Sequence, residues 1–436
     1  MYYVYQIIGN FNYKPVKFDF KIPETDNFDT ILNHEDKKQN LASIHIFRCL
    51  KVKQKKLIFL VPASVDTTSI DTTGIMTSWG LGKKEYDIIK MPANGTYKTG
   101  SFDYTPDEVL FFIYMDMLTR LKLGDTVFID INAGLNEYVN ALNDALSYAY
   151  VTIGLLNLKA EKNQDALKVY KIISEPVMRE SNMDTYTIYI QSIKKKIFFS
   201  LPAEEPLNLG STVGTDDKIK KMGFNLKFKE KKFYREIINN NIIIFNAIKM
   251  NTLSVLIIDK NLFSEEMKKR ILDCRDEIIE IYSETFFGDI SPGIRKLKIQ
   301  GVSKIISFIM SLNMYLGFID LIRQKFNDIT DSENSHIINL EKLGIASDNI
   351  YGNPTINLPV NSEFLKRDIH EFLSYHERIK ESIESNTDEK KDGSAKRNFF
   401  AHSGLDYNTV RPIFKGKVEF VGNLEEREKW LLSLYK

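Results

Sequence analysis

The chain has few cysteines, no marked excess of either charge and no long apolar run. Two of its 436 residues are cysteine, Cys49 and Cys274, too few for a disulfide framework or a thiolate metal site. The 59 Lys and Arg nearly balance the 58 Asp and Glu, so any nucleic-acid contact must come from local basic patches or a confined site. No apolar run approaches the roughly 20 residues that cross a bilayer, and the amino terminus has no signal-peptide pattern. We therefore expect a cytoplasmic protein with no membrane partner.

Two further absences narrow the choice of function. No GxGxxG fingerprint is present, which argues against a nicotinamide dehydrogenase. Five of the six histidines are scattered without metal-ligand spacing, and we expect structural roles for them: His34, His45, His336, His370 and His376. We accordingly expect no bound metal and no cofactor.

The first two hundred residues alternate between strand and helix patterns. Short apolar runs such as 57–61 and 126–131 are typical of buried strands in a parallel sheet, and amphipathic stretches lie between them. This alternation predicts a doubly wound, Rossmann-like α/β domain over residues 1–205. The expected strands are 2–8, 16–22, 57–61, 126–131, 167–173, 185–190 and 196–201, and the expected helices are 41–52, 106–122 and 136–151.

The second half of the chain is mostly helical in pattern. A segment rich in Pro, Gly and acidic residues at 201–217 predicts the domain boundary. Helices are expected at 264–286, 301–326 and 362–385, with a break at 357–361. We expect a helical insertion or linker region at 206–350 and a catalytic segment at 351–436, whose domain includes helices from about 236 onward. The basic stretch 218–235 fits a solvated linker better than an RNA track.

Arg397 and His402 form an R-x4-H pair, a spacing that alone arises often by chance. Its setting is a polar loop, then Ser394 as a candidate N-cap, then a short helix ending at Gly404. Positions five apart on a helix differ by about 140° in direction, so the pair does not stack. Asn398 shares a face with His402 and could orient the imidazole.

A splayed pair of this kind makes a poor site within one chain, but two copies related by a twofold axis could converge on one phosphate. Phe399 and Phe400 would anchor the helix. RNA carries its own nucleophile, the 2′-hydroxyl, and a histidine with a pKa near about 6.5 moves protons at neutral pH. An arginine stabilises developing charge on the phosphate. The expected products are a 2′,3′-cyclic phosphate and a 5′-hydroxyl. The alternative is a surface arginine and a histidine at a helix end.

The segment RNFFAHSGL, which begins at Arg397, resembles the R-x4-H segment of HEPN ribonucleases of type III CRISPR systems. Independently, DTVFIDINAGLNEYVNAL (125–142) is similar to a CARF-domain segment in which a strand ends in Asp and Gly-x-Asn opens a helix. That family often has Thr-His where this chain has Asn132 and Ala133, so the resemblance does not extend to cleavage of the ligand. It implies a CARF–HEPN endoribonuclease that cleaves single-stranded RNA and is activated by a cyclic oligoadenylate, either cyclic tetra-adenylate or hexa-adenylate.

Ligands of open α/β sheets bind at the carboxyl ends of the strands, and three loops of this chain are expected there. A fourth loop, 94–100, is glycine-rich and could cover the ligand. Ordinary turn chemistry is the alternative for each loop. The candidate ligand-binding residues are Gly9, Asn10, Phe11, Pro62, Ala63, Ser64, Lys98, Asn132, Ala133, Gly134, Leu135 and Asn136.

Two other functions stay open. The chain could be a non-catalytic nucleotide sensor that signals to a partner, or a free-standing ribonuclease that needs no activator. Substitution of Arg397 or His402 distinguishes a non-catalytic sensor from a nuclease. Titration with cyclic nucleotide distinguishes a ribonuclease that needs no activator from one that a ligand activates. In the leading hypothesis the protein is a homodimer or a higher homo-oligomer.

Overall fold

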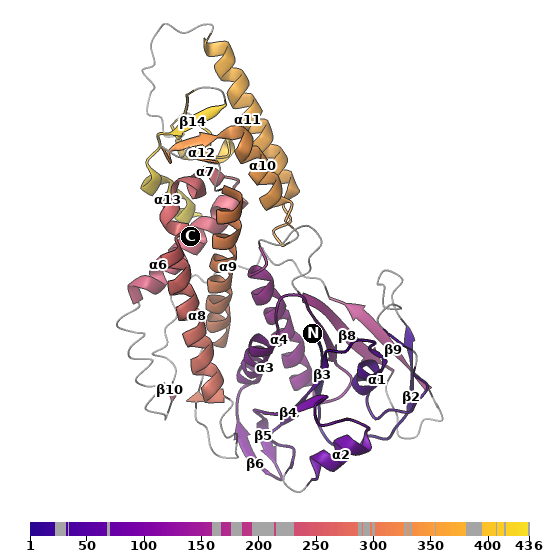
Figure 1. The fold of residues 1–436 in the computed structure, drawn as a ribbon. Coiled ribbons are helices and arrows are strands. Elements are labelled where there is room, and N and C mark those ends of the chain that lie inside the picture. The colour runs from indigo at the N-terminus through magenta and orange to yellow at the C-terminus, as the bar shows by residue number, and fades with distance from the viewer. Residues whose placement is uncertain are drawn as a thin grey trace.

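A seven-stranded sheet forms the core of the amino-terminal half (Figure 1). The strand order is β2-β9-β8-β7-β1-β3-β4, and every neighbouring pair is parallel except β8 and β9. The strands are β1 (Tyr2–Ile7), β2 (Lys17–Lys21), β3 (Lys55–Pro62), β4 (Tyr86–Met91), β7 (Asp125–Asp130), β8 (Leu167–Ser174) and β9 (Thr185–Ser192). The computed structural model describes residues 1–21, 32–33, 35–67, 70–158, 167–175, 185–193, 213–214, 231–286, 290, 297–298, 301–326, 329–330, 334–353, 355–380, 395–406, 408–413 and 416–434.

Helices cover both faces of this sheet because alternate side chains of each strand point to opposite faces. Tyr3, Tyr5 and Ile7 enter one apolar core with α3 (Pro106–Arg120) and α4 (Asn136–Leu155). Val4 and Ile8 enter a second core with α1 (Ala42–Cys49) and α2 (Thr72–Ser78). The predicted Rossmann-like fold is confirmed, as are the predicted strands apart from 196–201, which lies outside the described residues. β4 and α2 were not predicted.

Residues 94–100 are not the loop that the glycines suggested. They belong to an antiparallel hairpin of β5 (Asn94–Tyr97) and β6 (Gly100–Asp103). Gly95 and Gly100 have φ of 106° and 131°, which only glycine adopts freely, so they shape the hairpin. Lys98 lies exposed at its turn.

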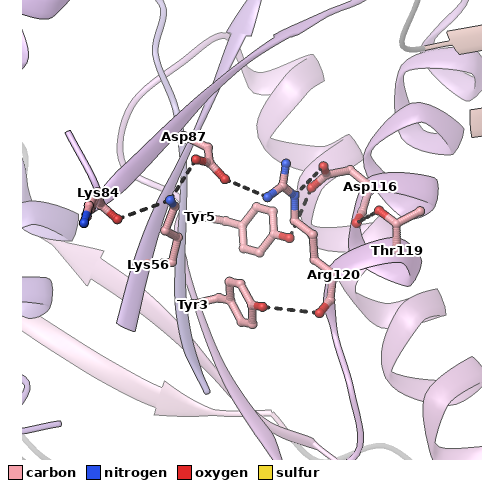
Figure 2. Close-up of polar contacts among 8 residues, drawn as sticks. All are labelled: Tyr3, Tyr5, Lys56, Lys84, Asp87, Asp116, Thr119 and Arg120. Carbon is pink, nitrogen blue, oxygen red and sulfur yellow. Dashed lines mark hydrogen bonds and ion pairs between the residues drawn. The ribbon is translucent and has the colours of Figure 1, made fainter. Parts of the chain in front are cut away.

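A polar network fixes the end of α3 against the sheet (Figure 2). The Arg120 guanidinium contacts Asp116 Oδ1 and Asp87 Oδ2, both at 2.7 Å, and Lys56 Nζ lies 2.9 Å from Asp87. Tyr5 donates its hydroxyl to Asp116 at 3.2 Å. Burial raises the pKa of Asp116 despite the nearby arginine, whereas at Asp87 the hydrogen bonds from Lys56 and Arg120 outweigh burial and lower the pKa. The network ties the end of α3 to β1, β3 and β4.

The second half is helical, as predicted, but also holds a small antiparallel sheet that the sequence did not reveal. Its order is β12-β14-β13. α11 begins at Pro359 rather than at residue 362. The boundary segment 201–217 lies outside the described residues except Val213–Gly214. The elements are β10 (Val213–Gly214), α6 (Lys231–Lys249), α7 (Leu253–Ile258), η3 (Lys260–Phe263), α8 (Glu265–Phe286), β11 (Leu297–Lys298), α9 (Val302–Phe326), β12 (Ile337–Asn339), α10 (Leu340–Tyr351), α11 (Pro359–Lys380), α12 (Ala395–Ala401), β13 (Val410–Pro412), β14 (Lys417–Phe420) and α13 (Leu424–Ser433).

The two halves share one apolar core, with α3 and α4 packed against α8 and α9 (Figure 1). Asn313 of α9 donates to the carbonyl of Thr152 on α4 at 3.0 Å. A Cβ atom at Gly317 would lie 2.0 Å from the carbonyl oxygen of Leu155, so only glycine permits this approach. α9 is, among the described residues, the one helix long and apolar enough to cross a membrane. Since 89% of its most apolar window is buried inside the protein, it has the environment of a core helix.

Candidate functional sites

The carboxyl ends of β1, β3 and β7 lie side by side and bring the predicted loops together. A Cβ atom at Gly9 would lie 3.8 Å from the Cα atom of Gly134, so the loops after β1 and β7 touch. The hairpin reaches the same edge, because Thr99 Oγ1 donates to the carbonyl of Ser64 at 2.9 Å. The amide of Asn94 donates to the hydroxyl of Tyr138 in the first turn of α4 at 3.2 Å. Four separate segments therefore meet at one edge of the sheet.

The Asp130 carboxylate connects α1 to the loop that follows β7. Its buried carboxylate accepts from the Ser43 amide at 2.9 Å, and so caps α1 from outside that helix. The other oxygen accepts from the Asn132 amide at 2.9 Å and from Asn132 Nδ2 at 2.6 Å. Burial raises the pKa of Asp130 to about 6, although these hydrogen bonds oppose the shift. One strand-terminal carboxylate thus holds both α1 and the loop that follows β7.

Gly134 is required for the close approach of that loop to β1. Its φ is 112°, and a Cβ atom there would lie 2.9 Å from Cγ2 of Ile7. α4 begins directly afterwards, and its N-cap residue, Leu135, makes no side-chain capping bond. The Tyr138 amide already donates to the Leu135 carbonyl at 3.0 Å, so the amides of Asn136 and Glu137 are the ones that could bind an anion. Gly134, Leu135 and Asn136 are all exposed, and Ala133 is half-buried.

Several predicted ligand residues have structural surroundings instead. Asn132 uses its side chain internally, since Nδ2 also donates to the carbonyl of Ile172 at 3.1 Å and Oδ1 accepts from the Ser174 amide at 2.6 Å. The Phe11 ring is 6% exposed and its centroid lies 6.3 Å from that of Trp79. Pro62 and Ala63 are buried, and Ser64 is half-buried. The predicted ligand residues that are exposed at this edge are Gly9, Asn10, Lys98, Asn132, Gly134, Leu135 and Asn136.

The hairpin contacts made by Thr99 and Asn94, and the contribution of Tyr138, were not anticipated. The four-residue strands of the hairpin are too short for alternation to stand out. The glycines at 95 and 100 were the one available signal, and they indicate turns and close backbone approach without specifying a pairing.

Arg397 and His402 lie at a second, separate place, on and just beyond α12. The helix ends at Ala401, earlier than the predicted Gly404, and residues 402–404 form a turn. Phe399 is fully buried, with its ring centroid 5.5 Å from that of Trp430, and Phe400 packs against the same core, so the predicted anchor is confirmed. Arg397 and His402 are exposed, and Asn398 is half-buried. Ser394 lies outside the described residues.

The buried side of this helix is braced by one arginine. Arg427 is 3% exposed, and its guanidinium carbon lies 4.0 Å from the ring centroid of Trp430. It donates to Thr409 Oγ1 at 3.1 Å and to the carbonyl of Asn408 at 3.0 Å. Burial lowers the pKa of Arg427. Arg397 lies on the opposite, exposed face of the same helix. Within the described part of the chain, no three His, Cys, Asp or Glu side chains lie together as metal ligands would.

An open sheet with exposed loops gathered at the carboxyl ends of parallel strands defines the first half as a ligand-binding α/β domain. Residues 3–176 match the family model of the CARF domain of the CRISPR system endoribonuclease Csx1. This part of the chain is therefore similar to a CRISPR-associated CARF domain, as the sequence resemblance predicted. CARF domains bind the cyclic oligoadenylate signalling molecules of type III CRISPR systems. The matched region ends before the helical half. No curated protein matches the chain.

Proposed function

We propose that this protein is an endoribonuclease of type III CRISPR defence that a cyclic oligoadenylate activates and that cleaves single-stranded RNA without a metal. The observation that carries the proposal is the exposed Arg397 and His402 pair, held by a buried anchor in a helical region that shares its core with a CARF domain. The protein acts in the cytoplasm as a homodimer or higher homo-oligomer, in which two copies of the pair and of Asn398 complete one site.

The chemistry follows from these side chains. A His402 imidazole takes the proton of the 2′-hydroxyl as its oxygen attacks the adjacent phosphorus, and an imidazolium returns a proton to the departing 5′-oxygen. The Arg397 guanidinium stabilises the extra negative charge on the phosphate. The products are a 2′,3′-cyclic phosphate and a 5′-hydroxyl. DNA resists because it lacks the 2′-hydroxyl.

The ligand binds at the carboxyl edge of the CARF sheet, against the open amides of α4 and the exposed Asn10 and Lys98. α4 begins at this edge and ends against α9, where Asn313 and Gly317 make the contacts described above. α9 packs on α6 and α10. Asn251, just after α6, bonds Ser403 next to His402, and α10 packs on α11, whose Asp368 bonds the same serine. A ligand that favours one placement of α4 therefore acts on the helices that hold the R-x4-H segment.

Cyclic tetra-adenylate is the preferred activator, because a small ring with an even number of repeats suits a twofold dimer. Hexa-adenylate has the same symmetry and is the next candidate. The test is cleavage of a labelled single-stranded RNA with each ring from three to six adenylates, in the presence of a chelator. We expect cleavage with the tetra-adenylate, and we expect the products to carry a 2′,3′-cyclic phosphate and a 5′-hydroxyl. Cleavage that is equally fast without any ring, or that requires a divalent metal, contradicts the proposal.

A further inference from the structure

The turn that follows His402 is fixed by buried polar contacts on both sides. Ser403 has φ of 53°, a left-handed conformation that a serine seldom adopts, and Gly404 continues it with φ of 72°. The Ser403 hydroxyl donates to the Asp368 carboxylate at 2.5 Å and accepts from Asn251 Nδ2 at 3.0 Å. Ser254 Oγ donates to the carbonyl of Gly404 at 3.3 Å. Each residue after the histidine is therefore held by a different helix or helix end.

The groups that hold the turn are themselves buried and fixed. Asp368 is 7% exposed on α11, and Asn251 is 7% exposed just after α6. Asn251 Nδ2 also donates to the carbonyl of Asn361 in the first turn of α11 at 3.0 Å, which joins the two helices. The backbone of His402 is bonded at both ends, to the Asn398 carbonyl at 3.0 Å and from the Leu405 amide at 2.8 Å. Its imidazole is exposed, and the fixed backbone sets the point and the Cα–Cβ direction from which the ring projects.

Left-handed residues that are not glycine persist where surrounding contacts impose them, and they gather at functional sites. Here the contacts are a buried carboxylate and a buried amide aimed at one hydroxyl. A helix end that needed no particular direction would finish with glycine alone, as Gly404 could do.

We propose that Ser403 and Asp368 are positioning residues for His402. The Asp368 carboxylate holds the Ser403 hydroxyl, and this bond imposes the turn that aims the imidazole at the RNA phosphate. The inference rests on the proposed ribonuclease activity of the Arg397 and His402 pair.

The test uses the full chain with Ser403→Gly, Asp368→Ala and Asp368→Asn. Ser403→Gly relieves the backbone strain but removes the bonds of the hydroxyl to Asp368 and Asn251, which costs stability. The folded fraction of each variant is therefore measured, and kcat is expressed per folded protein. Ser403→Gly and Asp368→Ala should each lower kcat by up to about 10²-fold through misplacement of the ring, with KM for RNA unchanged. Asp368→Asn keeps an acceptor for the hydroxyl and should restore most of kcat. Ser264→Gly, the same change at a hydroxyl that bonds the Met267 amide, should leave kcat unchanged.

A second readout does not depend on RNA. In histidine labelled with ¹³C in the ring, the His402 signal is assigned among the six histidines as the one lost in His402→Ala. This signal should shift or broaden in Ser403→Gly and in Asp368→Ala. In Asp368→Asn it should lie close to its position in the unmodified chain. If kcat and this signal stay unchanged in Ser403→Gly, or if kcat falls only in proportion to lost folded protein, the positioning role is wrong. If the unmodified chain cleaves no RNA, the proposed function fails, and the ring signal still decides whether Ser403 and Asp368 hold His402.

Discussion

The contact between α4 and α9 gives the sharpest prediction about coupling between the two halves. Gly317→Ala places a Cβ atom 2.0 Å from the carbonyl oxygen of Leu155 and 3.0 Å from Cδ1 of Leu158. The carbonyl belongs to the last residue of α4 and cannot rotate away as a flexible side chain would. α4 must therefore move away from α9 for the alanine to fit.

The size of the effect can be worked out with a matched glycine. Gly344→Ala lies within α10, where the new Cβ would meet its nearest atoms, in Ile369 and Lys366, at 3.9 Å, an ordinary contact distance. This substitution should stabilise the chain by about 0.5–1 kcal/mol, the usual difference between alanine and glycine in a helix. Gly317→Ala gains the same amount and loses about 1–3 kcal/mol to overpacking. The difference between the two variants isolates the overpacking cost.

The assay pairs urea unfolding with RNA cleavage at saturating cyclic tetra-adenylate. We expect Gly317→Ala to be less stable than Gly344→Ala and to lose most of its activation, while the ligand affinity of its carboxyl edge changes less. If the two alanine variants are equally stable and Gly317→Ala is fully activated, the contact between α4 and α9 does not couple the ligand edge to the R-x4-H segment.

Three further predictions concern the ligand edge. Asp130 has a pKa near 6 when folded and about 4 when unfolded, so its contribution to stability is full below about pH 4 and is lost as pH rises to 6. The unfolding free energy of the unmodified chain relative to Asp130→Asn should therefore fall by up to about 3 kcal/mol between pH 4 and 7 in urea titrations; a flat difference contradicts this. Gly134→Ala should lower thermal stability and ligand affinity together, because φ of 112° and the contact with Ile7 exclude a side chain; an unchanged melting temperature would show that the loop simply adjusts. Lys98→Ala should weaken binding of cyclic tetra-adenylate in calorimetry, most strongly at low salt, without altering the melting temperature, since the side chain is exposed; unchanged affinity at low salt would remove Lys98 from the site.

Periodicity predicted six of the seven strands of the sheet, because apolar runs of five or six residues are strong signals. β4 was not predicted, since Asp87 and Lys90 interrupt its apolar residues. The hairpin after β4 and the small sheet β12-β14-β13 were missed, since strands of three or four residues carry little alternation. Phe11 illustrates another limit. An aromatic residue in a loop fits a stacking role and a packing role equally well, and only the position of Trp79 decides between them.

Long-range partners explain why the roles of single polar residues could not be predicted. Asn132 is a polar loop residue of the kind that often contacts ligands. Its side-chain amide, however, bonds the backbone of Ile172 and Ser174, forty or more residues further along the chain. Ser403 bonds Asp368, 35 residues earlier, and no local pattern marks that pair. Local motifs such as R-x4-H indicate which chemistry is available, and the packing of distant segments determines its direction.

The most direct test of the central claim is cleavage of single-stranded RNA by the unmodified chain, Arg397→Ala and His402→Ala, with saturating cyclic tetra-adenylate and a chelator present. Both variants should fold and bind the ring as before, because the two side chains are exposed and lie far from the ligand edge in the sequence. We predict activator-dependent cleavage by the unmodified chain and its loss in both variants. Cleavage that persists in either variant would contradict it.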